Sequence, residues 1–499
     1  MDYPKELEGL VDLEIPPRSI VTEEGTTFFQ AIRDGSKMVG VLGNFGGFEG
    51  SRHDASGGLL CQQTATNAAA LRARLPWLRP VPLGLRTSVG FGDRLGLATV
   101  GHIRAIRSVP GGESTIAPIF AQQSVRENTR TGRTPQEVLD DATWGVFEAG
   151  WRHPWGADAD HLKTTEDVQS FARAGYTFFT IDPGDHVDDA VDVDQAELET
   201  RFQSLPWEAL EDVPTDLERR FLASPVAVDG RDVAFDELLL RRAAVKYGRA
   251  VAHTATMYRD IVSAMAGRPF ELEVSVDETD SPTSLIDHIY IATELRRLGV
   301  RWVSLAPRFV GSFEKGVDYI GDVETFTAEF ALHAAVARQL GPYKLSLHSG
   351  SDKFSIYPIT SRLTGASAGR TPGPMVHVKT AGTSFLEALR AISRVDTKLF
   401  REILTLARDR YETDRATYHV SAQLSKVAAP EDLSDGGLMD LLDQFDARQV
   451  LHVTFGSILD RFGDRLQSTL RTAEESYAEV LETHFVRHIS PFVVTGSET

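Results

Sequence analysis

Residues 343–358 read YKLSLHSGSDKFSIYP, and this stretch decides the fold. Its first part, Lys344–Leu347, alternates and is apolar enough to predict a short buried strand. The composition then changes to His348-Ser349-Gly350-Ser351-Asp352-Lys353, in which Gly350 permits a tight turn. A strand that ends in a polar, glycine-containing loop is where α/β proteins usually place functional residues. A solvated turn with a capping Ser or Asp is the structural alternative.

The same pattern recurs along the chain: further apolar runs end in polar residues, and helical patterns separate these runs. Eight such runs alternating with helices favour a closed (β/α)8 barrel over an open sheet. No GxGxxG motif follows the first run, which argues against a dinucleotide-binding half. The eight predicted strands are Leu95–Ile103, Ala117–Val125, Gly156–Lys163, Tyr176–Ile181, Phe270–Val276, Val300–Leu305, Lys344–Leu347 and Met375–Val378.

The remaining segments predict additions to the barrel. Residues 1–90 form an N-terminal accessory module, with a strand at Lys37–Leu42 and a linker at Pro80–Gly92. The barrel itself occupies residues 91–394, and the acidic, helix-rich residues 187–268 form an insertion after its fourth strand. Residues 395–499 are helical by pattern and predict a C-terminal cap packed on the barrel.

Bulk composition excludes several classes of partner. The net charge of −19 argues against a nucleic-acid partner, since phosphate binding needs a basic surface. A single cysteine, Cys61, excludes an intramolecular disulfide framework and a cysteine-rich zinc site. No leader pattern opens the sequence, and no apolar run is long enough to cross a membrane. We therefore expect a cytoplasmic protein without membrane or nucleic-acid partners.

In a barrel, the carboxyl ends of all strands meet at one face, so polar residues distant in sequence converge there. Several histidines and carboxylates at these ends are what an open divalent-metal site needs. Each histidine alone is more often structural than a ligand. Among them we predict His161, His348 and His377 as metal ligands, with His102 and His186 as reserves.

Asp160 and Glu278 form the predicted acid/base pair, because they come from the third and fifth strands and could face each other across the barrel mouth. The structural alternative for Glu278 is a cap on the helix after Pro282. Lys379 could instead be a Schiff-base lysine, as in barrel aldolases. The predicted substrate-binding residues are Gln123, Arg308, Ser351, Asp352, Lys353 and Lys379. The cations among them would bind a carboxylate or phosphate of the substrate.

The predicted site residues lie in a series of distinctive segments, which are GFGDRLGLATVGHIRAI, FAQQSVRENTRTGRTPQEVLDDA, WGADADHLKT, FFTIDPGDHVDD, VSVDETDSPTS, SLAPRFVGSFEKGVDYIGD, KLSLHSGSDKFSIYPI and HVKTAGTSFLEALR. In these segments the chain resembles the tagaturonate epimerase family of bacterial hexuronate catabolism. The resemblance runs from about residue 76 to the C-terminal helices, and Gly365–Pro374 is longer than the family's short loop.

The resemblance implies interconversion of D-tagaturonate and D-fructuronate, two small sugar acids, with a divalent metal such as Zn²⁺, Mn²⁺, Co²⁺ or Ni²⁺. Because the inverted carbon is β to the ketone, retro-aldol cleavage and re-addition fits better than simple enolisation. Hydride transfer would need a nicotinamide site, which the sequence does not indicate. The alternatives are a metal-dependent aldolase or isomerase acting on a related ketose and, more remotely, a non-enzymatic sugar-binding barrel.

Overall fold

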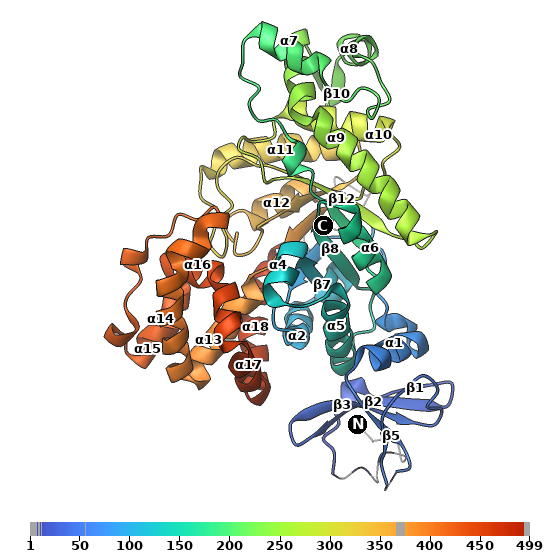
Figure 1. Cartoon of the computed structure of the whole chain (residues 1–499), viewed down its shortest axis with the longest axis vertical. Helices are drawn as coiled ribbons and strands as arrows, with labels where there is room; N and C mark the ends of the chain where they lie inside the picture. The colour runs from blue at the N-terminus through green and yellow to red at the C-terminus, as the bar shows by residue number, and fades with distance from the viewer. Residues whose placement is uncertain (1–6, 8–9, 11, 55, 366–374, 494–499) are drawn as a thin grey trace.

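The structure of the protein is a computed structural model that describes residues 7, 10, 12–54, 56–365 and 375–493. Figure 1 shows a central barrel with an N-terminal sheet at one end, the insertion at the opposite end and the C-terminal helices on one side. The long loop noted at Gly365–Pro374 lies, from residue 366 onward, outside the described residues. No helix among the described residues is both long and apolar enough to cross a membrane.

The N-terminal part is a five-stranded antiparallel sheet in the order β1-β2-β3-β5-β4. It confirms the strand predicted at Lys37–Leu42, and it leads into α1 (Ala65–Arg74). Its strands are β1 (Val21–Glu23), β2 (Thr26–Arg33), β3 (Ser36–Leu42), β4 (Ser51–Arg52) and β5 (Leu59–Gln62).

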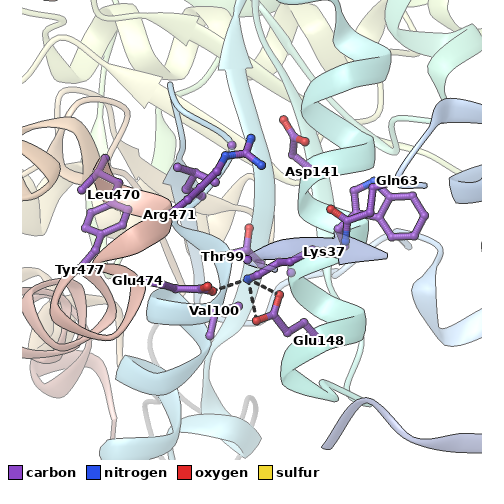
Figure 2. A pocket seen from close by; sticks show the side chains of 15 residues that line it. Lys37, Gln63, Thr99, Val100, Asp141, Glu148, Leu470, Arg471, Glu474 and Tyr477 are labelled. Atoms are coloured by element: carbon purple, nitrogen blue, oxygen red, sulfur yellow. Dashed lines mark hydrogen bonds and ion pairs between the residues drawn. The ribbon is translucent and has the colours of Figure 1, made fainter. Parts of the chain in front are cut away.

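One lysine joins this sheet to the barrel and to the C-terminal helices. The Lys37 ammonium lies 2.8 Å from both carboxylate oxygens of Glu148 in α5 (Pro135–Ala149). It also forms an ion pair with Glu474, the first residue of α18 (Glu474–Ile489). Figure 2 shows this junction, where the sheet, the barrel and the C-terminal helices line one small pocket. The ion pairs therefore hold the sheet against helices α5 and α18.

The centre of the molecule is the predicted eight-stranded parallel barrel, closed in the order β6-β7-β8-β9-β12-β13-β14-β15. Closure joins its last strand to its first, with His377 opposite Ser88 and Lys379 opposite Gly90. The strands are β6 (Ser88–Gly92), β7 (Ala117–Ser124), β8 (Gly156–Leu162), β9 (Phe178–Ile181), β12 (Glu271–Val276), β13 (Ser304–Pro307), β14 (Lys344–Leu347) and β15 (Val376–Lys379).

The first barrel strand was predicted in the wrong place. The run Leu95–Ile103 enters helix α2 (Thr99–Ser108), and the strand lies earlier, within the stretch interpreted as a linker. Gly90 and Gly92 have a low propensity for strands, so the strand was not recognised from its residue types. The barrel nevertheless needs both glycines. A Cβ added at Gly90 would lie 2.6 Å from the Gln122 side chain, and one at Gly92 would lie 2.4 Å from the Ala381 carbonyl oxygen.

Helices alternate with the strands and cover the barrel. Four of them, which follow the N-cap residues Ser124, Thr134, Thr164 and Ser284, begin with a capping box in which a Ser or Thr side chain and an acidic side chain satisfy each other's backbone donors. Besides α2 and α5, the barrel helices are α3 (Gly112–Thr115), α4 (Val125–Thr131), α6 (Thr165–Ala174), α10 (Leu285–Arg297), α11 (Val323–Gln339), α12 (Tyr357–Thr364) and α13 (Thr383–Val395).

Two helical additions complete the chain. The insertion after β9 contains α7 (Gln195–Gln203), α8 (Pro214–Leu222), the hairpin β10 (Val226–Val228) and β11 (Arg231–Val233), and the long α9 (Glu237–Met265). The C-terminal region, helical as predicted, contains α14 (Thr397–Asp414), α15 (Asp435–Asp440), α16 (Phe445–Val453), α17 (Phe455–Thr472) and α18.

Candidate active site

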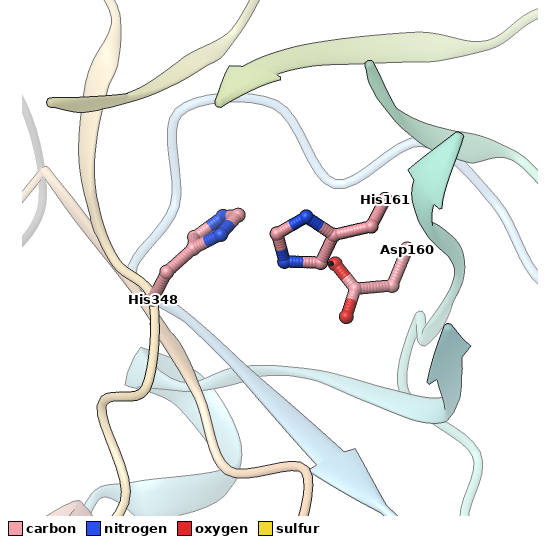
Figure 3. Close-up of side chains that lie close together, drawn as sticks. All are labelled: Asp160, His161 and His348. Carbon is pink, nitrogen blue, oxygen red and sulfur yellow. Dashed lines mark ion pairs between the residues drawn. The ribbon is translucent and has the colours of Figure 1, made fainter. Parts of the chain in front are cut away.

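Two of the predicted histidines face each other at the mouth of the barrel (Figure 3). His161 lies near the end of β8, and His348 follows β14 directly. Their ring centroids are 4.9 Å apart and the rings are close to perpendicular. His161 has a left-handed backbone with φ 52°, beside a register irregularity between β8 and β9. Such local distortions occur near active sites, where they redirect a side chain.

His161 lies between two carboxylates. Its Nδ1 atom is 3.2 Å from Oδ2 of Asp182, and its Nε2 atom is 3.8 Å from Oδ1 of Asp160. Burial lowers the pKa of His161, but the Asp160 charge and the Asp182 hydrogen bond outweigh burial and raise this pKa to about 9.

His348 is buried and also lies between two carboxylates. Its Nε2 atom is 2.6 Å from Oε1 of Glu273, and its Nδ1 atom is 3.1 Å from Oδ1 of Asp277. Ser275 donates its hydroxyl to Asp277 and lies 3.2 Å from the same ring nitrogen. Burial lowers the pKa of His348, but Asp277 and Glu273 together raise it to about 10.

Lys379 is a buried cation beside the two histidines, and we call these three residues and the carboxylates around them the centre of the site. Its Nζ atom lies 2.6 Å from Asp160, 2.9 Å from Glu273 and 3.0 Å from Asp158, and it donates to Thr180 at 2.7 Å. Burial lowers the pKa of Lys379, but the three carboxylates hold this pKa well above its usual value. An ammonium held in this way stays protonated, which argues against the Schiff-base role because imine formation needs the neutral amine.

The carboxylates of the centre differ in protonation. Burial raises the pKa of Asp160, but the Lys379 ammonium and both imidazoles outweigh burial and hold this pKa well below its usual value. Asp158 is fully buried, and burial raises its pKa to about 7. Asp160 is therefore ionised at neutral pH, which fits a base or a metal ligand better than an acid.

The donor set fits a divalent cation. One ligand atom each from Asp160, His161 and His348 lie within 4.8 Å of one another, and so do those of His161, Asp182 and Glu278. Imidazole and carboxylate ligands suit Zn²⁺, Mn²⁺, Co²⁺ and Ni²⁺. Without a metal, protons on both imidazoles supply the positive charge that a cation would supply. The surrounding carboxylates are Asp158, Asp160, Asp182, Glu273 and Asp277.

Glu278 lies in the loop between β12 and α10, with 40% of its side chain exposed. Its carboxylate is 3.7 Å from the Arg126 guanidinium at the start of α4. The capping alternative for Glu278 is wrong, because Ser284 is the N-cap of α10 and forms its capping box with Asp287. Glu278 thus stays available at the mouth of the site.

His377 lies deeper in the barrel than the other two predicted ligands. It precedes Lys379 by two residues on the same strand face. Its Nδ1 atom is 2.9 Å from the Ser88 hydroxyl, and burial lowers the pKa of His377 to about 3. Among the described residues, none of the groups of clustered metal-ligating side chains includes His377. A neutral ring bonded to the barrel floor fits a structural role.

A pocket with several cations opens over this centre. Arg94 is held by Glu127 at 2.7 Å and lies over the Phe455 ring, whereas Lys315 contacts the Ser349 hydroxyl at 2.5 Å. A second hollow, which Glu278 lines, shares part of this wall. Besides residues of the centre, the pocket is lined by Arg94, Ser124, Arg126, Glu127, Lys315, Ser349, Ser351, Ala381, Gly382, Tyr418 and His452.

The predicted substrate-binding residues divide into two groups. Ser351 and Lys379 line the pocket, as expected. Gln123 instead donates to Thr131 and accepts from Arg133, and neither it nor Arg308 is among the residues that line the pocket.

Asp352 and Lys353 also point away from the pocket. Asp352 accepts from Arg448 at 3.0 Å and lies 2.7 Å from Nε2 of His484, both in C-terminal helices. The buried Lys353 ammonium donates to the carbonyl oxygens of Glu314, Val317 and Ser351. These contacts fit a role in fixing the loop after β14 to the rest of the chain.

Asp352, His484 and His488 form a second cluster of ligand-type residues, but its polar atoms are already engaged. The backbone N–H of Asp352 donates to Nε2 of His488, whose Nδ1 faces the carbonyl oxygen of His484. His484 Nδ1 lies 3.3 Å from Glu387. The cluster therefore connects α18 to the loop that carries His348.

Sequence reasoning missed two kinds of site residue. Asp158 and Glu273 lie inside strands, and each alternates with apolar neighbours, which is a signal for a polar residue pointing into the barrel. Lys315, Tyr418 and His452 reach the pocket from loops and C-terminal helices. Nothing in their local sequence signals this position, since only the packing of the C-terminal region brings the last two there.

Comparison with known proteins identifies the family of this chain. The family model for tagaturonate epimerase matches residues 17–492. The chain belongs to the tagaturonate epimerase family. It is 43% identical over 483 residues to the tagaturonate/fructuronate epimerase of Thermotoga maritima, covering 95% of this chain and 96% of that protein.

Solved structures of a relative share the whole architecture. The fructuronate-tagaturonate epimerase from Cohnella laeviribosi, crystallised with two glycerols, superposes with a TM-score of 0.90 at 34% identity. The match covers 98% of this chain and 99% of that chain, and the native crystal structure of the same enzyme gives a TM-score of 0.89. The protein is therefore an enzyme of the isomerase class, an epimerase.

Proposed function

We propose that this epimerase interconverts D-tagaturonate and D-fructuronate with a divalent cation held by His161, His348 and Asp160. The observation that carries the proposal is the placement of two imidazoles and an ionised carboxylate within 4.8 Å of one another. The names of the relatives from Thermotoga maritima and Cohnella laeviribosi supply the substrate pair.

The reaction is a retro-aldol cleavage followed by re-addition. The inverted carbon is β to the ketone, so its own hydrogen is not made acidic by enolisation. Removal of the proton from its hydroxyl turns that carbon into an aldehyde, while the bond to the α-carbon breaks and its electron pair forms the enediolate. Rotation of the aldehyde exposes its other face. Re-formation of the bond and return of the proton complete the inversion without any net loss of atoms or electrons.

The chain's own residues supply proton transfer. Asp160, kept ionised by Lys379, accepts the hydroxyl proton, and Glu278 exchanges a proton at the mouth of the site. A bound divalent cation would stabilise negative charge on the enediolate oxygens. Lys379 stays protonated and keeps Asp160 in place.

The uronate carboxylate is bound by Lys315 and Arg126. Lys315 forms no ion pair with a described carboxylate within 4.0 Å, and the distance of 3.7 Å between Arg126 and Glu278 leaves that guanidinium weakly engaged. Both residues line the pocket that contains Asp160 and His348. Two cations with spare hydrogen-bonding capacity suit an anionic substrate better than a neutral ketose.

Product analysis tests the proposal directly. Purified enzyme incubated with D-tagaturonate should form D-fructuronate, and a chelator should stop conversion until a divalent metal is added back. Release of free aldehyde without the epimer would favour the aldolase alternative. Lys315→Met should reduce kcat/KM for the uronate at least 10-fold, while any slow turnover of a neutral ketohexose changes little. An equal loss on both substrates would contradict the carboxylate assignment.

A further inference from the structure

The loop that carries Asp277 and Glu278 is short and is fixed at both ends. At its start, Asp277 contacts His348 at 3.1 Å. At its end, the Thr283 backbone N–H donates to the carbonyl oxygen of Arg308, whose own N–H donates to the Thr283 hydroxyl. Residues 278–282 between these points approach the insertion.

Two residues of the insertion bind the middle of this loop. Asp189 accepts the backbone N–H of Asp280 at 2.8 Å through one carboxylate oxygen and the Ser281 hydroxyl at 2.7 Å through the other. Lys246, in α9, donates to the Ser281 hydroxyl at 2.6 Å and lies 3.3 Å from Asp189. A carboxylate, a hydroxyl and an ammonium thus form one closed network on the loop.

The network is built to be rigid. The Lys246 side chain is 5% exposed, and the backbone N–H of Asp188 donates to the Lys246 carbonyl oxygen at 3.0 Å. In the next residue of α9, the buried Tyr247 hydroxyl lies 3.2 Å from that of Thr283. Charge-assisted hydrogen bonds are stronger than neutral ones, so these bonds, which are exposed at the Asp280 N–H and half-buried at Ser281, restrain the loop more than water would.

Glu278 depends on this restraint because few contacts hold its side chain. Its carboxylate is 40% exposed and has the one ion pair with Arg126, at 3.7 Å, among the described residues. The direction of the side chain is therefore set by the backbone, and that backbone is held two residues further on by Asp189. A displacement of about 1 Å at a reacting group can cost about 10²-fold in rate.

We infer that Asp189 and Lys246 are positioning residues, through which the insertion holds Glu278 in its catalytic place. The inference rests on the acid/base role proposed above for Glu278. It gives the insertion a function, since the helices that interrupt the barrel after β9 supply the clamp for the loop after the next strand, β12.

A double-mutant cycle tests the clamp. Lys246→Met keeps the length of the side chain and should lower kcat about 10- to 100-fold with KM changed less than threefold. Lys246→Arg should recover much of the loss. The matched control is Arg242→Met, one turn earlier in α9, where the side chain pairs with exposed Asp192 and not with the loop; its kcat should stay within twofold. Glu278→Gln and the pair Lys246→Met/Glu278→Gln complete the cycle, with metal content and Tm measured for each.

The outcomes separate the two claims. If Lys246 acts through Glu278, its substitution costs nothing further in the Glu278→Gln background. A loss that adds in full, or a wild-type kcat in Lys246→Met beside an impaired Glu278→Gln, overturns the clamp and leaves the proposed function standing. A wild-type kcat in Glu278→Gln removes the acid/base role of Glu278 and the clamp with it.

Discussion

Replacing Lys379 by Met should destabilise the protein in a way that depends on pH. Met keeps the length of the side chain but leaves Asp158, Asp160 and Glu273 buried without their shared cation, which lies 2.6–3.0 Å from each of them. Removing one partner of a buried ion pair costs about 3–5 kcal/mol. We expect a loss of that size in the free energy of unfolding at pH 8.

The pH dependence follows from the protons that the carboxylates would take up. Without Lys379 their pKa values rise in the folded state, so the folded protein binds more protons than the unfolded chain. Stability then falls as pH rises, and the deficit of the variant is largest at pH 8 and shrinks toward pH 5. Asp158, whose pKa burial already raises to about 7, should be the first of the three to take up a proton.

Urea denaturation followed by circular dichroism, on metal-free protein between pH 5 and 8, measures this deficit. Lys344→Met is the matched control, because the Lys344 ammonium is equally buried but donates to the Ser88 hydroxyl and forms no ion pair with a described carboxylate within 4.0 Å. That control should be neutral or stabilising, since burying an unpaired ammonium is unfavourable. A Lys379→Met protein as stable as wild type at pH 8 would refute the reasoning.

Three further predictions follow from the site and the core. Chelation should abolish activity, and Zn²⁺, Mn²⁺, Co²⁺ or Ni²⁺ should restore it. The variant His348→Ala should lose both bound metal and activity while it keeps the fold. Full turnover by enzyme that elemental analysis shows to be metal-free would contradict this prediction. Asp160→Asn and Glu278→Gln should each lower kcat by roughly 10²–10⁴ with less effect on KM, and Asp160→Asn should also weaken metal binding because Asp160 is a proposed ligand. A thermal loss without a kinetic one would remove that residue from the mechanism. His102 is buried, and burial lowers its pKa from 6.5 to about 4. As pH falls, the same imidazole therefore takes up a proton in the unfolded chain before it does so in the folded protein. The free energy of unfolding should fall by about 3 kcal/mol between pH 6.5 and pH 4. His102→Asn should flatten that part of the stability curve, and an unchanged slope would show that His102 is not responsible.

The barrel could be predicted from the sequence because buried parallel strands leave apolar runs that end in polar residues. Seven of the eight strands were placed by this pattern, although the run Val300–Leu305 begins four residues before β13 (Ser304–Pro307). The first was not, because Ser88–Gly92 is short and glycine-rich, while the apolar run after it belongs to a helix. Gly90 and Gly92 are needed because a neighbouring strand and a neighbouring loop approach the backbone closely there. Residue propensities carry no information about such contacts.

The meeting of Asp160, His161 and His348 was predictable because each lies in the last part of a barrel strand or directly after one. The same rule misdirected the assignment of Asp352 and Lys353, because a tight turn points successive side chains in different directions and these two face other parts of the chain. Lys315 and Tyr418 could not be found, since their position depends on how distant segments pack.

The closure of the barrel has a consequence for how the chain is made. Strand β6 cannot pair with β15 until about 290 further residues have been made, and synthesis at 5–20 residues per second makes that interval roughly 15 to 60 s. The pocket wall needs Tyr418 and His452, later still. Until β15 is made, the edge of β6 that pairs with it stays open, and an unpaired strand edge of this kind is prone to aggregation. The pocket over His161 and His348 is therefore complete only after His452 has been made and packed.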